Sequence, residues 1–174
     1  MDEQLRITEA LAHDIVTWKL DEEIITTQMS TSVKTLRRIA SDLDVSHGDI
    51  FSSMLQVISE QGKDIPKSFI TISENMFSDN VVNWGRIAVL FTFAGHLAKF
   101  SKRNELLERP DVVSTWLVEF VNAHLLEWIV KVGGWESFNE HFKDKKEKLW
   151  IKDGIYYGLA AGAAVVGAAM IFAR

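Results

Sequence analysis

Apolar and polar residues follow one another along this chain with the period of an α-helix, and one stretch is apolar on every side. Residues 7–25 and 30–62 each place apolar side chains about one helical turn apart, which predicts two amphipathic helices. Between Arg86 and Lys99 the apolar residues surround the helical axis. This pattern predicts a central helix that other helices bury. It is shorter than the roughly 20 apolar residues that cross a bilayer.

Local signals predict where these helices begin and end. Thr8 is expected near the start of the first helix and Asn83 at the N-cap of the central one. Residues 46–49 are expected to weaken or break the second helix, because Gly48 costs about 1 kcal/mol inside a helix. Asp64 and Pro66 signal the start of a short helix that continues to about residue 77.

The last third of the chain predicts one long helix and one short helix. The long one runs from Pro110 to about Val132 and ends at Gly133 and Gly134, which supply positive φ angles. The short helix covers residues 135–142. The long helix is expected to bury a broad stripe that consists of Val113, Trp116, Leu117, Phe120, His124, Leu125, Trp128 and Ile129.

The C-terminus differs sharply in composition from the rest. Roughly 20 uncharged residues, from Gly154 to Ala173, are enough to cross a hydrocarbon core about 30 Å thick. We therefore expect a C-terminal transmembrane anchor, with a buried hairpin helix as the alternative. Lysines before this run predict that the preceding residues face the cytosol. Gly158 and Gly162 form a GxxxG pair through which two anchors could associate weakly.

These patterns predict an all-α fold, a helical bundle around a central apolar helix with a C-terminal transmembrane helix. The predicted division is a bundle over residues 1–148 and an anchor over residues 149–174. A length of 174 residues with 47% hydrophobic content suits one globular domain. The net charge of −5 gives no basic surface for nucleic acid. The N-terminus is acidic and does not resemble a secretory signal.

Candidate chemistry is sparse. The chain contains no cysteine, which excludes disulfides, thiolate metal sites and cysteine nucleophiles. We find no catalytic motif, and we expect no metal, no cofactor and no enzymatic activity. His96 and His124 are interpreted as core histidines that each make one hydrogen bond. Arg86 lies in the first turn of the central helix, where the helix dipole disfavours a cation; binding an incoming carboxylate would explain it, and a solvated arginine with a surface partner is the alternative that this segment alone favours.

Four motifs occur in order along the chain. Residues 83–86, NWGR, followed by an apolar helix, resemble the first homology motif of the Bcl (B-cell lymphoma two) family of apoptosis regulators. Residues 128–138 resemble the second motif, residues 36–43 the third and residues 11–20, more weakly, the fourth. The chain is most similar to the myeloid-cell-leukaemia (Mcl) pro-survival branch of that family. The resemblance covers nearly the whole chain.

The resemblance implies a surface groove beside the central helix that takes up the amphipathic third-motif helix of a pro-apoptotic relative. Arg86 would pair with the partner's aspartate. Methionines are flexible and suit adaptable binding surfaces, so Met54 and Met76 also favour a groove; core packing is the alternative for each apolar position. The implied groove residues are Phe51, Met54, Ile58, Phe69, Ile72, Met76, Asn83, Gly85, Arg86, Val89, Leu90 and Phe93.

The chain's own third-motif helix departs from the family pattern at one position. Its residues are Leu36, Ile39, Ala40, Ser41, Asp42 and Leu43. An aspartate usually follows the small residue, and here that position is Ser41, with Asp42 about 100° further round the helix. This favours a protein that captures the helices of others and forms heterodimers with them. A pore-forming effector of the same family and a tail-anchored helical adaptor are the alternatives.

A tail-anchored member of this family is expected at the outer mitochondrial membrane with its bundle in the cytosol. The endoplasmic reticulum is the alternative location. The chain's expected partners are therefore a membrane, through the C-terminal helix, and the amphipathic helices of pro-apoptotic relatives.

Overall fold

The computed structural model describes residues 1–21, 29–60 and 64–143, and all regular structure in these ranges is helical. The prediction of an all-α fold is confirmed for this part of the chain. In order, the helices are α1 (Asp2–Lys19), α2 (Thr31–Glu60), α3 (Ile65–Met76), α4 (Trp84–Arg103), the 3₁₀ helix η1 (Pro110–Val112), α5 (Val113–His124), α6 (Leu126–Lys131) and α7 (Gly134–Phe142).

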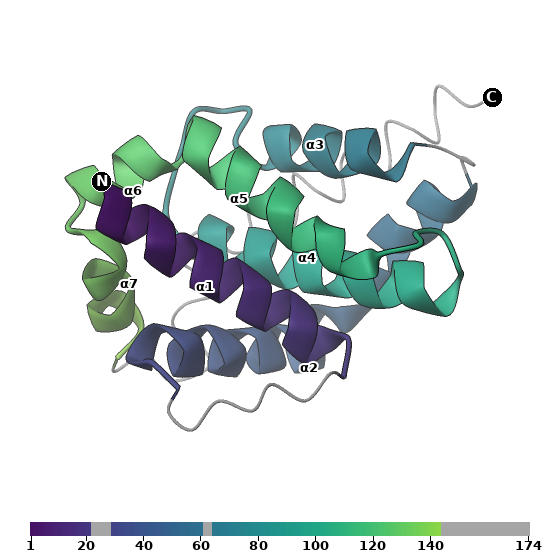
Figure 1. Ribbon diagram of the computed structural model, residues 1–174, viewed down its shortest axis with the longest axis horizontal. Coiled ribbons are helices and arrows are strands. Elements are labelled where there is room, and N and C mark those ends of the chain that lie inside the picture. The colour runs from purple at the N-terminus through teal and green to yellow at the C-terminus, as the bar shows by residue number, and fades with distance from the viewer. Residues whose placement is uncertain (22–28, 61–63, 144–174) are drawn as a thin grey trace.

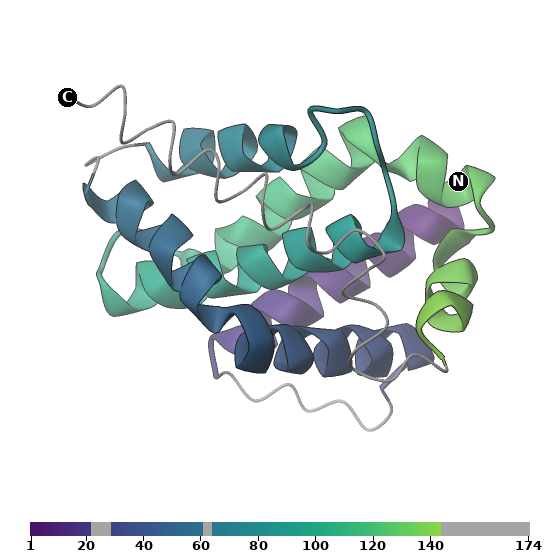
Figure 2. The same cartoon turned by 180° about the vertical axis from the view of Figure 1, so that it is seen from behind.

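Helix α4 runs through the middle of the bundle, as its apolar pattern predicts. It contacts α1, α2, α3 and α5, and Figures 1 and 2 show it between helices in both views. All but five of its side chains are buried, from Trp84 at one end to Ser101 at the other. Asn83 caps its start, because the Asn83 side chain accepts a hydrogen bond from the Arg86 N–H.

The predicted start of the first helix is wrong. Helix α1 already begins at Asp2, and its first turn carries Asp2 and Glu3, whose charges suit the positive end of the helix dipole. Thr8 lies inside the helix, where its hydroxyl donates to the Gln4 carbonyl at 2.8 Å and accepts from the Trp135 indole N–H at 2.9 Å. Thr8 therefore links α1 to α7 and caps neither.

Helix α2 bends where residues 46–49 predict a weakness. His47 has non-helical dihedral angles, φ −142° and ψ 19°, although hydrogen bonding continues on both sides. The bend changes the direction of the second half of α2, which crosses α4 (Figure 2). Asp64 caps α3, as predicted, by accepting from the Lys67 N–H at 3.2 Å.

The helix predicted from residue 110 to about 132 is interrupted at Leu125, where φ is −123°. The bend allows the Trp128 ring to meet the Trp84 ring edge-on at 5.1 Å. His124, predicted in the buried stripe, is exposed and lies against Phe120 at 4.6 Å. Gly133 and Gly134 end α6 with φ angles of 104° and 70°, as predicted.

The predicted anchor from Gly154 to Ala173, including Gly158 and Gly162, lies outside the described residues. None of the helices within the described ranges combines the length and apolar character that crossing a membrane requires.

Candidate functional site

Arg86 is the best-defined element of the predicted site. Its side chain is only 4% exposed, although it carries a charge. Its guanidinium donates to both Asp79 carboxylate oxygens, at 2.5 and 2.7 Å, and to the carbonyls of Met76 and Val81, at 3.1 and 2.9 Å. The residue predicted to bind a partner's carboxylate thus already binds a carboxylate of its own chain.

The turn before α4 places Asp79 against this guanidinium. Asn80 takes a left-handed conformation, φ 60°, and the Val81 N–H donates to Asp79 at 3.0 Å. The hydrogen bond from Arg86, aided by the one from Val81, holds the pKa of Asp79 well below its usual range. Asp79 is 53% exposed, so water reaches one side of this ion pair. Its negative charge offsets the unfavourable position of Arg86 at the N-terminus of α4.

One donor of Arg86 is unused. Its Nε–H is buried and has no hydrogen-bond partner among the described residues. A buried donor without a partner costs about 1–3 kcal/mol relative to a satisfied one. The guanidinium therefore has capacity for a further acceptor, such as a carboxylate oxygen.

The apolar groove candidates lie on three helices around α4. Phe51, Met54 and Ile58 are on α2, Phe69, Ile72 and Met76 on α3, and Val89, Leu90 and Phe93 on α4, and each is at most 4% exposed. The Phe69 and Phe93 rings stack at 6.1 Å. The three helices thus bring these residues into one buried cluster, in which they pack as core residues. Gly85 is buried and Asn83 half-buried beside Arg86.

The third-motif residues of α2 are divided between core and surface. Leu36, Ile39, Ala40 and Leu43 are at most 1% exposed. Ser41 is exposed, and its hydroxyl donates to the Arg37 carbonyl at 2.9 Å. Asp42 lies 4.0 Å from Arg38 on the same helix. The apolar face of this motif is therefore packed inside the chain's own bundle.

Two arginines of α2 hold this segment in place. The sequence pattern predicts that they lie on the polar face of the helix but does not predict their partners. Arg37 binds Asp14 of α1 with two hydrogen bonds of 2.9 and 2.7 Å. Arg38 donates to the Phe142 carbonyl of α7 at 2.8 Å. Asp14 is the residue that sequence reasoning misses, although it lies within the fourth motif. These contacts fasten helix α2 to α1 and α7.

A second ion-pair cluster joins α1, α2 and α4. Asp44 binds Lys19, and also the His96 Nε2 at 2.7 Å. Burial raises the pKa of Asp44, but the hydrogen bonds from His96 and Lys19 outweigh burial and keep that pKa below its usual value. His96 makes the one expected hydrogen bond, to Asp44, but it is 22% exposed, so its expected place in the core is wrong.

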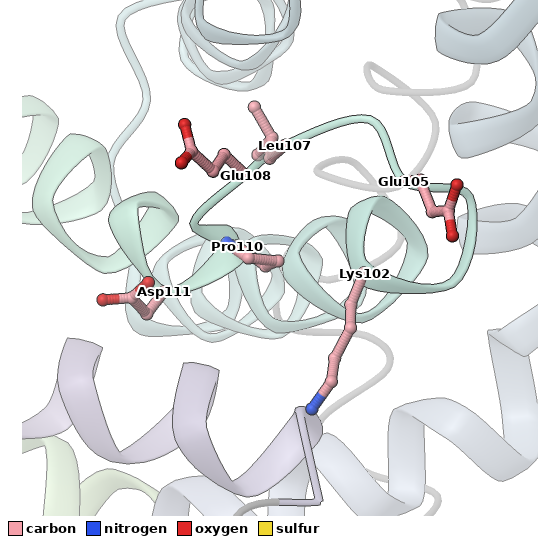
Figure 3. Close-up of a pocket in the computed structure, with 6 residues that line it drawn as sticks. All are labelled: Lys102, Glu105, Leu107, Glu108, Pro110 and Asp111. Atoms are coloured by element: carbon pink, nitrogen blue, oxygen red, sulfur yellow. The ribbon is translucent and has the colours of Figure 1, made fainter.

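A cavity of about 500 Å³ lies at the end of α4 and along the connection to η1 (Figure 3). It is lined by Lys102, Glu105, Leu107, Glu108, Pro110 and Asp111. The Lys102 ammonium points away from it and donates to the Leu20 carbonyl at 3.3 Å. The described residues contain no group of three side chains that could hold a metal ion. This cavity contains none of the predicted site residues.

Comparisons with known proteins agree with this geometry. A sequence model described as apoptosis regulator proteins of the Bcl-2 family matches residues 36–135. The apoptosis regulator Bcl-2 of the dog, Canis lupus familiaris, is 31% identical over 134 residues, which are 77% of this chain and 56% of the relative. The apoptosis regulator BAX of the mouse, Mus musculus, is 32% identical over 108 residues, 62% of this chain and 54% of the relative.

Among solved structures, a zebrafish pro-survival protein, NRZ, in complex with Bad BH3 superimposes with a TM-score of 0.69 at 25% identity. The match covers 79% of this chain and 93% of the zebrafish chain. The chain spans about half the length of the two curated relatives. The matched residues include α2 with its third motif, α4 with NWGR, and the glycines that end α6. The chain belongs to the Bcl-2 family of apoptosis regulator proteins.

Proposed function

We propose that this protein promotes cell survival by capturing BH3-type amphipathic helices of pro-apoptotic relatives beside α4. The observation that carries the proposal is the Arg86 guanidinium, which is 4% exposed and keeps a buried Nε–H without a partner. A carboxylate on an incoming helix would satisfy that donor and take the place of Asp79. The complex of the zebrafish relative with Bad BH3 supports this ligand class.

The surroundings of Arg86 suit an amphipathic helix. Apolar side chains of α2, α3 and α4 gather beside it, and a helix with apolar anchors about one turn apart would pack against them. The chain's own third motif is a poor competitor, because its apolar face is buried and Arg37 fastens it to Asp14. These contacts favour a receptor over a protein that presents its own α2 to others.

The proposal is tested by titrating a fluorescent BH3 peptide that carries the central aspartate into wild type and variants. Arg86→Ala should weaken binding, because the peptide aspartate loses its partner, but by less than the about 2–5 kcal/mol of an uncontested buried pair, because wild type must first break the Arg86–Asp79 pair. Asp79→Asn should tighten binding, because the internal competitor is removed. Arg109→Ala is the matched control, since Arg109 is 78% exposed and lies far along the chain from the site. Equal binding by wild type and Arg86→Ala would contradict the proposed role of Arg86.

The second candidate function is a pore-forming effector of the same family, and the chain is 32% identical to the apoptosis regulator BAX over 108 residues. The two functions differ in their action on membranes. A pro-survival protein should bind the peptide and leave liposomes of mitochondrial-type lipids intact, while an effector should release their contents when the peptide is added. Peptide-triggered leakage would overturn the pro-survival proposal.

We further propose that the protein belongs to the Mcl branch and works at the outer mitochondrial membrane, with its bundle in the cytosol. The uncharged run from Gly154 to Ala173 supports membrane attachment, and the GxxxG pair supports weak self-association through it. Deleting residues 154–174 should release the protein from isolated mitochondria. Retention of the truncated chain on the membrane would count against the anchor.

A further inference from the structure

A second cavity, of about 210 Å³, lies between α2 and α4. Its lining combines a hydroxyl and two apolar side chains with three side chains that are or can become positively charged, namely Ser52, Leu55, Phe100, Lys99, Arg103 and His96. No carboxylate is among these lining residues. Such a cavity favours a small anion that also carries an apolar part.

This cavity is distinct from the site at Arg86. The cavity adjoins one groove candidate, because its lining residue His96 stacks on Phe51 at 4.8 Å, but it lies toward the other end of α4 from Arg86. Arg86 is in the first turn of α4 and Arg103 is its last residue. With a rise of 1.5 Å per residue, the two ends are about 25 Å apart.

Within the described part of the chain, the hydrogen-bond donors of Arg103 are free for a ligand. It makes no hydrogen bond or ion pair within the described ranges of the chain. It is also not needed to cap α4. The Phe100 carbonyl accepts from the Asn104 N–H at 3.0 Å and the Asn104 side chain at 2.9 Å, and the Ser101 carbonyl accepts from the Leu106 N–H at 2.9 Å.

The carboxylates that approach the basic groups from other helices are already paired. Asp21, which follows α1, binds Lys99 at 3.0 Å and is 75% exposed, so an anion with two charges can displace it readily. Asp44 of α2 is shared between Lys19 and His96 beneath the cavity. Asp21 offsets one of the two charges of Lys99 and Arg103, so the cavity keeps a local positive charge in a protein whose net charge is −5.

We propose that this cavity binds a phosphate monoester, with Lys99 and Arg103 on the phosphate oxygens and Leu55 and Phe100 against the ester substituent. Because two cations lie on one side of the cavity, a ligand with two negative charges fits it better than a carboxylate, which has one. Arginine and lysine are both established phosphate ligands in proteins, and arginine binds two oxygens at once. The phosphate is either free in solution or the head group of a lipid such as phosphatidic acid.

The test titrates phenyl phosphate and inorganic phosphate into the chain of residues 1–174 and follows backbone amide resonances by NMR. We expect shifts at Leu55, Lys99 and Phe100, with phenyl phosphate bound more tightly than inorganic phosphate. Arg103→Gln should lower the affinity for phenyl phosphate about tenfold, because the complex loses one charge-assisted hydrogen bond. Arg109→Gln removes the same charge away from the cavity and should leave the affinity unchanged. BH3 peptide binding should be the same in both variants.

A second arm uses vesicles of phosphatidylcholine with and without phosphatidic acid. Binding to the vesicles with phosphatidic acid that Arg103→Gln abolishes and Arg109→Gln preserves would support the site with a lipid as its ligand. The proposal is overturned if neither free phosphates nor these vesicles show binding that depends on Arg103. If the protein fails to bind the BH3 peptide, the phosphate-binding test still applies, because it does not involve Arg86.

Discussion

Replacing Gly95 by alanine should loosen the contact between α1 and α4. A Cβ built on Gly95 lies 2.7 Å from the Lys19 Cγ and 3.2 Å from the Ile15 carbonyl oxygen. Lys19 cannot simply move aside, because it is 7% exposed and its ammonium binds Asp44. The added methyl group must therefore push the backbone of α1 away from α4.

The magnitude follows from two opposing terms. Alanine favours a helix over glycine by about 1 kcal/mol. An extra methyl group in a well-packed core costs about 1–3 kcal/mol. The steric cost exceeds the helix-propensity gain for two reasons. The added methyl group meets the Ile15 backbone carbonyl, which cannot rotate away, and a shift of Lys19 disturbs its ion pair with Asp44. We expect Gly95→Ala to destabilise the fold by up to about 2 kcal/mol.

Gly48→Ala is the matched control. Gly48 also lies inside a helix, α2, but a Cβ there has no atom within 4 Å. Because Gly48 follows the non-helical His47, it should gain at most about 1 kcal/mol from helix propensity, without a steric cost.

The two variants are compared with wild type by urea unfolding followed by circular dichroism. The urea midpoint should fall for Gly95→Ala and rise for Gly48→Ala, with unchanged slopes. Thermal midpoints should move by about 2–4 °C for each kcal/mol. If Gly95→Ala were as stable as Gly48→Ala, the close packing of α1 on α4 would be refuted.

Three further perturbations test other contacts. Asp14→Asn should lower the free energy of unfolding by about 2–3 kcal/mol in urea, because it removes the charge that binds Arg37 of α2. The pair is largely buried, since the Asp14 side chain is 10% exposed and the Arg37 side chain 20%. An unchanged free energy of unfolding would show that this ion pair does not stabilise the fold. Thr8→Val should cost about 1–3 kcal/mol, because the buried Trp135 indole N–H loses its acceptor; near-UV circular dichroism should report the disturbed ring, and an unchanged spectrum and stability would contradict this contact. The folded-state pKa of Asp79 is below its unfolded value, so its contribution to stability is present at neutral pH and is lost as the pH falls through the folded-state pKa. The loss of stability between neutral pH and about pH 2 should therefore be smaller in Asp79→Asn than in wild type, and an equal loss would be evidence against this ion pair.

Features set by neighbours in the chain could be predicted from the sequence. The apolar surround of α4 identifies the central helix, because only a buried helix tolerates apolar residues on all sides. Asn83 and Asp64 cap α4 and α3 as expected, because a cap is a contact over three residues. The glycine pair at 133 and 134 ends α6 because its backbone adopts positive φ.

Features set by contacts between distant residues could not be predicted in this way. The break at Leu125 occurs without a glycine or proline and depends on where Trp128 meets Trp84. The polar face of α2 correctly holds Arg37, but nothing local shows that it binds Asp14, 23 residues away. The partner of Arg86 lies only seven residues away, yet the pairing depends on the turn at Asn80.

The Arg86–Asp79 pair has a consequence for how an incoming helix would be selected. A partner's carboxylate would replace one carboxylate by another, so much of the Coulomb energy gained with the partner is lost with Asp79. The net affinity must then come mainly from apolar surface buried along α2, α3 and α4, and the charge would set the register of the helix. A helix without an acidic residue would displace Asp79 without compensation and leave Arg86 buried and unpaired. The internal pair would therefore act chiefly against wrong partners, through the cost of an unpaired buried charge.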